Sequence, residues 1–141
     1  MKILLRSFLS LFVWLYQRTN GQFGGEVQGL PVLLLTTTGR KTGKKRITPL
    51  GYFEYEGNYV IIASNAGFNT HPAWFHNLKS HPQVALQIRD KHLTASAEPA
   101  DPTLRQKLWD QLVERAPGYG AYQKRTTREI PIVLLRPVSR T

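Results

Sequence analysis

Residues 47–63, ITPLGYFEYEGNYVIIA, contain the clearest strand pattern in the chain. Aromatic and β-branched side chains are frequent in Ile47–Tyr55 and in Tyr59–Ala63, as they are in β-strands. The residues between them, Glu56-Gly57-Asn58, include a glycine that tolerates the positive φ of a tight hairpin turn. This stretch therefore predicts a β-hairpin.

Further short apolar runs lie on both sides of this hairpin. They are Val32–Thr37, Val84–Arg89, His92–Ala97 and Ile130–Leu135. The second and third predict another hairpin around Asp90-Lys91, and Pro131 favours an edge or the start of the last strand. Six short strands joined by hairpins, without alternating βαβ units, predict a small antiparallel barrel.

Two segments within this pattern have helical spacing. The first is Pro72–Lys79, with Trp74, Phe75 and Leu78 on one face. The second begins at the capping residue Asp101 and runs to about Arg115, and the Pro117-Gly118 pair then ends it.

Composition narrows the classes of protein that the chain can be. A length of 141 residues corresponds to one domain, and 41% hydrophobic residues exclude disorder of the whole chain. The absence of cysteine excludes a disulfide framework, an iron–sulfur cluster and a thiol nucleophile, and it fits a reducing cytoplasm. The net charge of +10 indicates an anionic partner, which could be nucleic acid, anionic lipid or a phosphorylated ligand.

The N-terminal segment is apolar but too short to span a membrane. Arg6 interrupts the run Ile3–Tyr16, whereas a spanning helix needs about 20 apolar residues. We interpret residues 1–20 as an amphipathic helix, followed by a glycine-rich loop over residues 21–30. The polar stripe of this helix would consist of Lys2, Arg6, Ser10 and Gln17. Three alternatives remain open: packing on the barrel or another subunit, contact with a bilayer through Trp14 and Tyr16, or a removed signal.

Much of the positive charge lies in the turn between the first two predicted strands. Five cations fall within seven residues, bracketed by Gly39 and Gly43: Arg40, Lys41, Lys44, Lys45 and Arg46. Cations and free backbone N–H groups suit an oxyanion such as phosphate, although the spacing is not that of a P-loop. Nucleic-acid binding is disfavoured because aromatic residues that could stack bases are not evident near the loop. A solvated hairpin tip is the remaining alternative.

A second dense segment runs from Ser64 to Leu78. Small and polar residues follow a strand there and enter a helix at Pro72, whose free N–H groups could meet oxygens of a planar ligand. His71 and His76 are five residues apart, without a carboxylate or thiol beside them, so we predict no metal site.

Together these motifs resemble the deazaflavin-dependent nitroreductase and quinone reductase family. The matching segments are Leu34–Gly43, Arg46–Leu50, Ala63-Ser64, His71–Leu78, Pro82–Val84, Tyr119, Tyr122 and Ile130–Val133. The resemblance implies a mainly β protein with flanking helices, in which residues 31–137 form a split β-barrel like that of FMN-binding oxidoreductases. It also implies coenzyme F-420, an 8-hydroxy-5-deazaflavin whose phosphodiester and polyglutamate tail would be the anionic partner.

The resemblance further implies a role for individual residues. The phosphate and tail would be held by Arg40, Lys41, Thr42, Lys44 and Arg46. Thr48, Pro49 and Leu50 would line the groove beside the ring. The ring itself would be cradled by Ser64, Asn65, Ala66, Gly67, Pro72, Ala73, Trp74 and Asn77. The catalytic residues would be Tyr119 and Tyr122, as a wall and as hydroxyl donors, although these tyrosines and Trp74 could equally be packing residues.

The implied activity is hydride transfer from the reduced coenzyme to an electron-poor acceptor: a quinone, an activated alkene or a nitroaromatic compound. Alternatives are a non-catalytic deazaflavin-storage protein, an FMN-dependent split-barrel reductase, and a membrane-peripheral or nucleic-acid-binding barrel. Because quinones reside in membranes, a cytoplasmic protein on the inner face of the cell membrane is one expectation. Gly51, Asn65 and Ala116 depart from members that reduce quinones and nitroimidazoles, and Ala116 makes activation of bulky nitroimidazoles doubtful.

Overall fold

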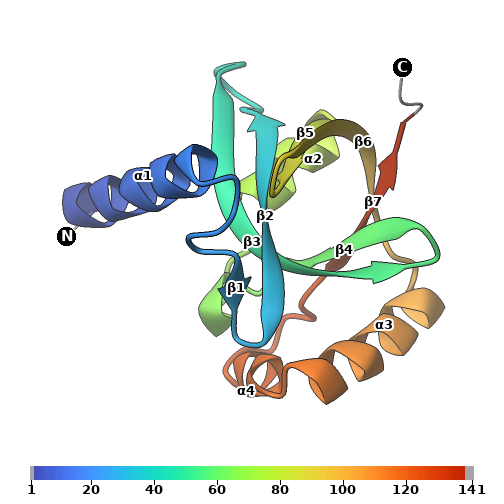
Figure 1. Ribbon diagram of the computed structural model, residues 1–141. Coiled ribbons are helices and arrows are strands. Elements are labelled where there is room, and N and C mark those ends of the chain that lie inside the picture. Colours follow the sequence, from blue (N-terminus) through green and yellow to red (C-terminus); the bar gives the residue numbers. More distant parts are fainter. Residues whose placement is uncertain (1, 139–141) are drawn as a thin grey trace.

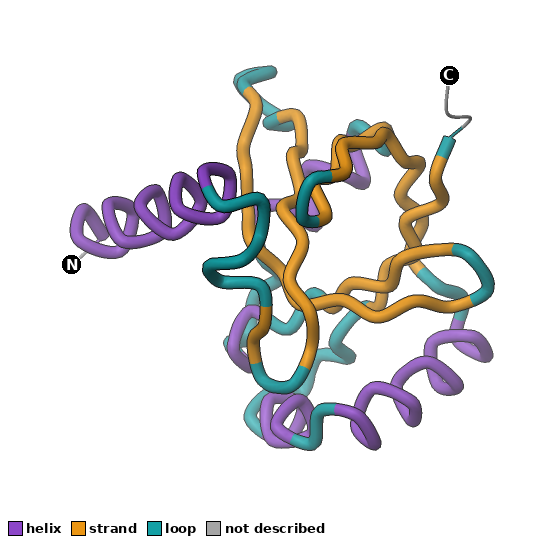
Figure 2. Tube along the Cα trace, viewed as in Figure 1, coloured by secondary structure: helices purple, strands orange, loops and turns teal. Residues whose placement is uncertain are grey.

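The computed structural model describes residues 2–138, with side chains from Leu9 onward. Helices surround a set of curved strands (Figures 1 and 2). The helices are α1 (Lys2–Arg18), the short 3-10 helix η1 (Asn65–Gly67), α2 (Ala73–Ser80), α3 (Pro102–Arg115) and α4 (Gly118–Lys124). The strands are β1 (Glu26–Val27), β2 (Leu30–Thr38), β3 (Lys45–Tyr55), β4 (Asn58–Ile62), β5 (Gln83–Ile88), β6 (Lys91–Pro99) and β7 (Ile132–Pro137).

Six of these strands form a closed barrel. Their order is β2-β3-β4-β7-β6-β5, and a further pairing between β2 and β5 closes the ring. All of the pairings are antiparallel, and β1 pairs with the first residues of β2 outside the ring. The predicted antiparallel barrel with flanking helices is therefore confirmed. Closure leaves these six strands without a free edge on which another chain could pair.

Alternate residues of the barrel strands contribute to separate buried clusters on the two faces of the sheet. Tyr59 and Ile61 of β4 pack in the barrel interior, with Trp74 and Leu78 of α2 in the same cluster. Val60 and Ile62 point the other way and belong to a second cluster with side chains of α3 and α4. Because successive strand residues face opposite sides, a strand buried on both faces is a continuous apolar run, which explains the sequence Tyr59–Ala63.

Both predicted hairpins form, and one of the two turns lies one residue earlier than predicted. Tyr55 pairs with Asn58, and the residues between them, Glu56 and Gly57, have φ of 50° and 80°, as a type I′ turn requires. The β5–β6 turn consists of Arg89 and Asp90, one residue before the predicted Asp90-Lys91, because Arg89 adopts the left-handed conformation at φ 57°.

The C-terminal helices follow their capping signals. The Asp101 side chain accepts a hydrogen bond of 2.8 Å from the Leu104 N–H, which confirms the predicted N-cap of α3. Pro117 ends α3 as predicted, but it also precedes α4, which the sequence reading did not include. Proline ends one helix and begins the next because a first helical turn does not need its missing N–H.

Helix α1 projects from the barrel, and its C-terminal end is anchored there (Figure 1). Tyr16 is fully buried against Val32 and Leu34, which supports the alternative of packing on the barrel and excludes Tyr16 from the alternative of a bilayer contact. Leu11 and Trp14 are each 53% exposed. Lys2, Arg6 and Phe8 lie outside the described side chains. Among residues 2–138, no helix is both long and apolar enough to cross a bilayer.

Candidate functional site

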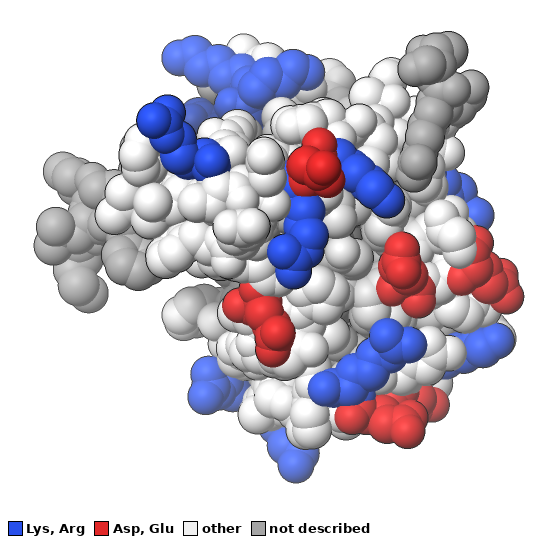
Figure 3. Space-filling model, in the orientation of Figure 1, with Lys and Arg blue, Asp and Glu red and all other residues white. Residues whose placement is uncertain are grey.

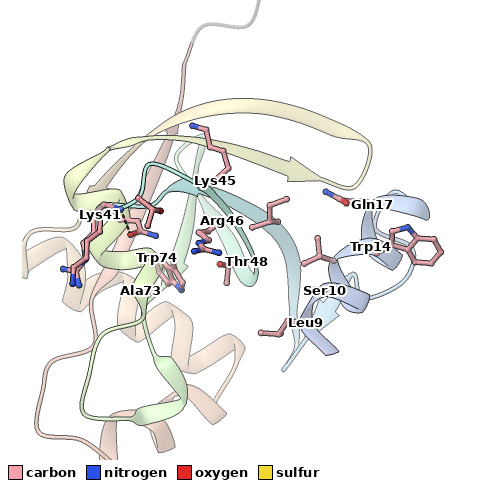
Figure 4. Close-up of a pocket in the computed structure, with 16 residues that line it drawn as sticks. Leu9, Ser10, Trp14, Gln17, Lys41, Lys45, Arg46, Thr48, Ala73 and Trp74 are labelled. Atoms are coloured by element: carbon pink, nitrogen blue, oxygen red, sulfur yellow. Dashed lines mark hydrogen bonds between the residues drawn. The ribbon is translucent and has the colours of Figure 1, made fainter. Parts of the chain in front are cut away.

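A cleft of about 820 Å³ lies where α1, the β2–β3 hairpin and α2 meet (Figure 4). The hairpin and α2 contribute Gly39, Arg40, Lys41, Thr42, Lys45, Arg46, Ile47, Thr48, Ala73, Trp74 and Asn77. Helix α1 contributes Leu9, Ser10, Val13, Trp14 and Gln17. One wall of the cleft is therefore cationic, and the other comes from a segment that sequence reasoning did not assign to the site.

The cationic wall is the tip of the β2–β3 hairpin. Figure 3 shows Lys and Arg side chains gathered over the end of the molecule that this tip occupies in Figure 1. The turn is closed by hydrogen bonds of 2.8 Å from the Gly39 N–H to the Lys44 carbonyl and from the Gly43 N–H to the Gly39 carbonyl. Gly43 has a φ of 71°, which glycine adopts without strain. The turn thereby directs Lys41 and Arg46 to the cleft, whereas Lys44 lies outside its lining.

Asn77 fixes this hairpin to α2. Its buried side-chain oxygen accepts a hydrogen bond of 3.1 Å from the Arg40 N–H, and its NH₂ group donates one of 3.3 Å to the Thr37 hydroxyl. An amide can donate and accept at once, so the Asn77 side chain alone connects α2 to the end of β2 and to the start of the turn. The contact of Asn77 with the ring stays a prediction, and what the structure shows is that Asn77 positions the start of the cationic turn.

Trp74 is shared between the cleft and the core. It lines the cleft, although only 6% of its surface is exposed and it packs with the barrel interior. The interpretation of Trp74 as a packing residue is therefore compatible with its place in the cleft, and its contact with the ring stays a prediction. A planar aromatic wall held by the core suits an aromatic ring in the cleft.

The second predicted loop, Ser64–Gly67, lies outside the lining of this cleft. Three consecutive residues are left-handed: Asn65 at φ 46°, Ala66 at φ 54° and Gly67 at φ 80°. The left-handed region is unfavourable for alanine, so surrounding contacts must hold Ala66 there.

Arg128 braces the residues on both sides of this loop. Its guanidinium donates to the carbonyls of Ser64 at 2.7 Å, Phe68 at 2.8 Å and Ala63 at 3.1 Å. The guanidinium nitrogen that donates to the Ala63 carbonyl also lies 2.9 Å from Nδ1 of His71. Sequence reasoning missed Arg128, because an arginine in a loop resembles any solvated cation until its acceptors are known.

The hydrogen bond between His71 and Arg128 requires the neutral form of His71. Burial, and then the charge of Arg128, lower the pKa of His71 below its ordinary value. A neutral Nδ1 can accept from the guanidinium, whereas a protonated one cannot. The rings of His71 and His76 are 5.8 Å apart, and within residues 2–138 no three His, Asp or Glu side chains are grouped as metal ligands would be.

The two predicted catalytic tyrosines lie on α4, away from the cleft lining. Their ring centroids are 5.6 Å apart. Tyr119 packs in the core beneath α3, and burial, together with the neighbouring Tyr122, raises the pKa of Tyr119 to about 12. Tyr122 is half-buried, and its hydroxyl accepts a hydrogen bond from the Gln28 side chain. Its carbonyl lies beside Gly67, so α4 borders the Ser64–Gly67 loop rather than the cationic turn.

The structure thus brings together eight of the predicted residues. They are Arg40, Lys41, Thr42, Arg46, Thr48, Ala73, Trp74 and Asn77. The other predicted residues do not line the cleft: Lys44, Pro49, Leu50, Ser64, Asn65, Ala66, Gly67, Pro72, Tyr119 and Tyr122. Lys45 and Ile47 join the cleft as neighbours of predicted residues. Successive residues of a strand face opposite sides, so the alternation through β3 did not indicate that all four residues from Lys45 to Thr48 line one cleft.

Comparison with known proteins gives consistent matches over most of the chain. A protein-family model described as F420H(2)-dependent quinone reductase matches residues 8–137. A Mycobacterium tuberculosis protein named F420H(2)-dependent quinone reductase is 40% identical over 125 residues, which cover 86% of this chain and 84% of the relative.

Solved structures show the same pattern. A structure titled F420-H2 dependent reductase (FDR-A) is 40% identical, has a TM-score of 0.69, and covers 75% of this chain and 94% of its own. Another, described as a domain-swapped dimer, is 36% identical with a TM-score of 0.69, and covers 88% and 98% respectively. HutZ of Vibrio cholerae, at 14% identity and a TM-score of 0.61, shares the fold alone. The expected split-barrel fold is confirmed.

Proposed function

The chain belongs to the F420H(2)-dependent quinone reductase family, and from this membership we propose that it transfers a hydride from reduced coenzyme F-420 to a quinone. The observation that supports the proposal is the cleft itself. It joins a cationic turn, which includes Lys41 and Arg46, to the aromatic wall of Trp74. An anionic tail and a planar ring on one molecule need both features in one cavity.

The donor set of the cleft fits this coenzyme. Arg40, Lys41 and Arg46 would hold the phosphodiester and the glutamate carboxylates, because guanidinium and ammonium groups form charge-assisted hydrogen bonds with both. Lys45 is less free to do so, since its ammonium already donates to the Thr38 hydroxyl at 2.8 Å. Thr48 and Trp74 would contact the ring.

When bound, the reduced coenzyme supplies a hydride, and the quinone needs that hydride and one proton to become a hydroquinone. The protein's contribution would be to hold the two reactants in contact and to exclude water around them. The catalytic role predicted for Tyr119 and Tyr122 stays a prediction. Tyr122→Phe tests the hydroxyl of the half-buried member of the pair by its effect on turnover.

Binding tests the cofactor assignment directly. We would titrate the protein with coenzyme F-420 and with FMN, and compare Arg46→Ala with Lys107→Ala, a charge-matched control on the exposed surface of α3. Loss of one exposed cation costs about 1 kcal/mol, so Arg46→Ala should weaken coenzyme binding about fivefold at low salt and less at high salt. Lys107→Ala should have no effect.

Equal weakening by the two substitutions would contradict the assignment of the turn as the tail site. Tighter binding of FMN than of coenzyme F-420 would favour the FMN-dependent alternative. Turnover separates an enzyme from a storage protein: oxidation of the reduced coenzyme should accelerate when a quinone is added. Binding without acceleration by any quinone would favour storage.

We further propose peripheral contact with an anionic membrane through the exposed side of α1. Leu11 is solvent-exposed there, Trp14 at the edge of the cleft is equally exposed, and the basic hairpin lies across the same cleft from the helix. Leu11→Ser should lower sedimentation with vesicles containing anionic lipid. Unchanged sedimentation would remove this proposal and leave the proposed reaction intact.

A further inference from the structure

We propose that α1 is the acceptor-side wall of the cleft, and that Leu9 and Val13 contact the hydrocarbon side chain of a lipid-soluble quinone. This inference rests on the proposed function and names the part of the same site that selects the acceptor.

The two sides of the cleft differ in chemistry. The hairpin and α2 present cations and Trp74, whereas α1 presents the apolar Leu9 and Val13. Ile47, which lies beyond Arg46 on β3, adds an apolar side chain. Leu9 and Ile47 are each 43% exposed, so apolar surface remains open within a cavity whose other end is polar. An amphipathic pair of ligands would match this division, with the charged tail at the turn and a hydrocarbon chain along the helix.

The spacing along α1 places one face of the helix on the cleft. Leu9, Val13 and Gln17 recur every four residues, and Ser10 lies beside them on the same face. Leu11 is 53% exposed but does not line the cleft. The helix therefore carries two apolar positions of the same residue type, Leu9 and Leu11, of which only Leu9 faces the site (Figure 4 shows Leu9).

The wall is held in place by the anchor at the end of the helix. The Tyr16 hydroxyl donates to the Val32 carbonyl and accepts from the Arg89 N–H, both at 2.8 Å. Val13 lies one turn before Tyr16 and packs against the same buried cluster. A wall fixed by a buried side chain can select a ligand by shape, because its contacts are already in position.

Two acceptors that differ only in the side chain test the inference. We would use 2-methyl-1,4-naphthoquinone and its homologue with a chain of two prenyl units. The readouts are the KM of each quinone and, without coenzyme, equilibrium binding of each quinone by calorimetry.

Leu9→Ser should weaken binding of the prenylated quinone and raise its KM about fivefold, since it replaces apolar contact with a hydroxyl. The unprenylated quinone should be unaffected. Ser10→Trp, which adds bulk to the same face, should have the same selectivity. Leu11→Ser is the matched control outside the cleft, and in assays without lipid vesicles it should change the KM and the binding of neither acceptor.

The outcomes separate this inference from the other proposals. Equal effects of Leu9→Ser and Leu11→Ser would show that the prenyl chain of the quinone binds apolar surface of α1 in general and not the cleft face, which would overturn the inference. Full affinity of both Leu9→Ser and Ser10→Trp for the prenylated quinone would also overturn it. If the wild type reduces neither quinone, the proposed function fails, and calorimetry still decides whether this face of α1 binds the prenyl chain of the quinone.

Discussion

Replacing Tyr16 with phenylalanine should destabilise the protein through one lost oxygen atom. Tyr16 is fully buried, and its hydroxyl joins α1 to β2 and to the β5–β6 turn. Phenylalanine keeps the ring and its packing. The substitution therefore isolates the hydrogen bonds of the hydroxyl, of which the two at 2.8 Å are the short ones and a third, to the Gln87 carbonyl, measures 3.5 Å.

The expected loss of stability comes from the two backbone groups that the substitution leaves without a hydrogen-bond partner. The buried Val32 carbonyl would lose its Tyr16 donor and the partly buried Arg89 N–H would lose its acceptor. An unsatisfied buried polar group costs about 1–3 kcal/mol, and water can partly replace the partner of Arg89, so we expect about 2–3 kcal/mol in total. For a domain of this size the corresponding decrease in Tm is about 6–9 °C.

Urea unfolding and thermal unfolding measure this loss. The control is Tyr55→Phe, which removes a hydroxyl from a half-buried tyrosine whose partner, Lys107, is exposed. Water replaces that bond, so the control should lose less than about 0.5 kcal/mol. Equal stability of the two variants would refute the reasoning that Tyr16 anchors α1 through buried hydrogen bonds.

Three further predictions concern other parts of the chain. Asp101→Ala removes the N-cap of α3 and should lower the free energy of unfolding by about 1 kcal/mol in urea; no change would mean that the cap bond at 2.8 Å contributes nothing in solution. Gly67→Ala should cost at least about 1 kcal/mol in the same assay, because φ is 80° and the new Cβ would lie 2.8 Å from the Tyr122 carbonyl; a neutral result would contradict the loop geometry. The lowered pKa of His71 means that the unfolded chain binds its proton first, so this contribution to stability is present above about pH 6.5 and is lost as the pH falls through the lowered value. Thermal scans across this range should show a smaller acid-side loss for His71→Asn, which cannot titrate, and an identical loss would exclude His71 as its source.

Local physics made much of the fold predictable. The hairpin at Glu56-Gly57 follows from residues that accept positive φ between two strand-forming runs, and the start of α3 follows from Asp101 before Pro102. Both depend on contacts among neighbours in the sequence. The cationic turn was likewise visible, because five charges in seven residues need no tertiary information.

The tertiary structure decided how these parts combine. Arg128 braces a loop 64 residues away at Ser64, and Tyr16 reaches Arg89 across 73 residues, contacts that no local pattern encodes. The placement of α1 beside the cationic turn also depends on contacts between residues far apart in the sequence. The sequence of an apolar helix face alone is compatible with packing on a barrel, a membrane or a ligand, and the buried Tyr16 decides between them. The sequence determined the local elements and the charge of the ligand, and barrel closure determined which side chains share a cleft.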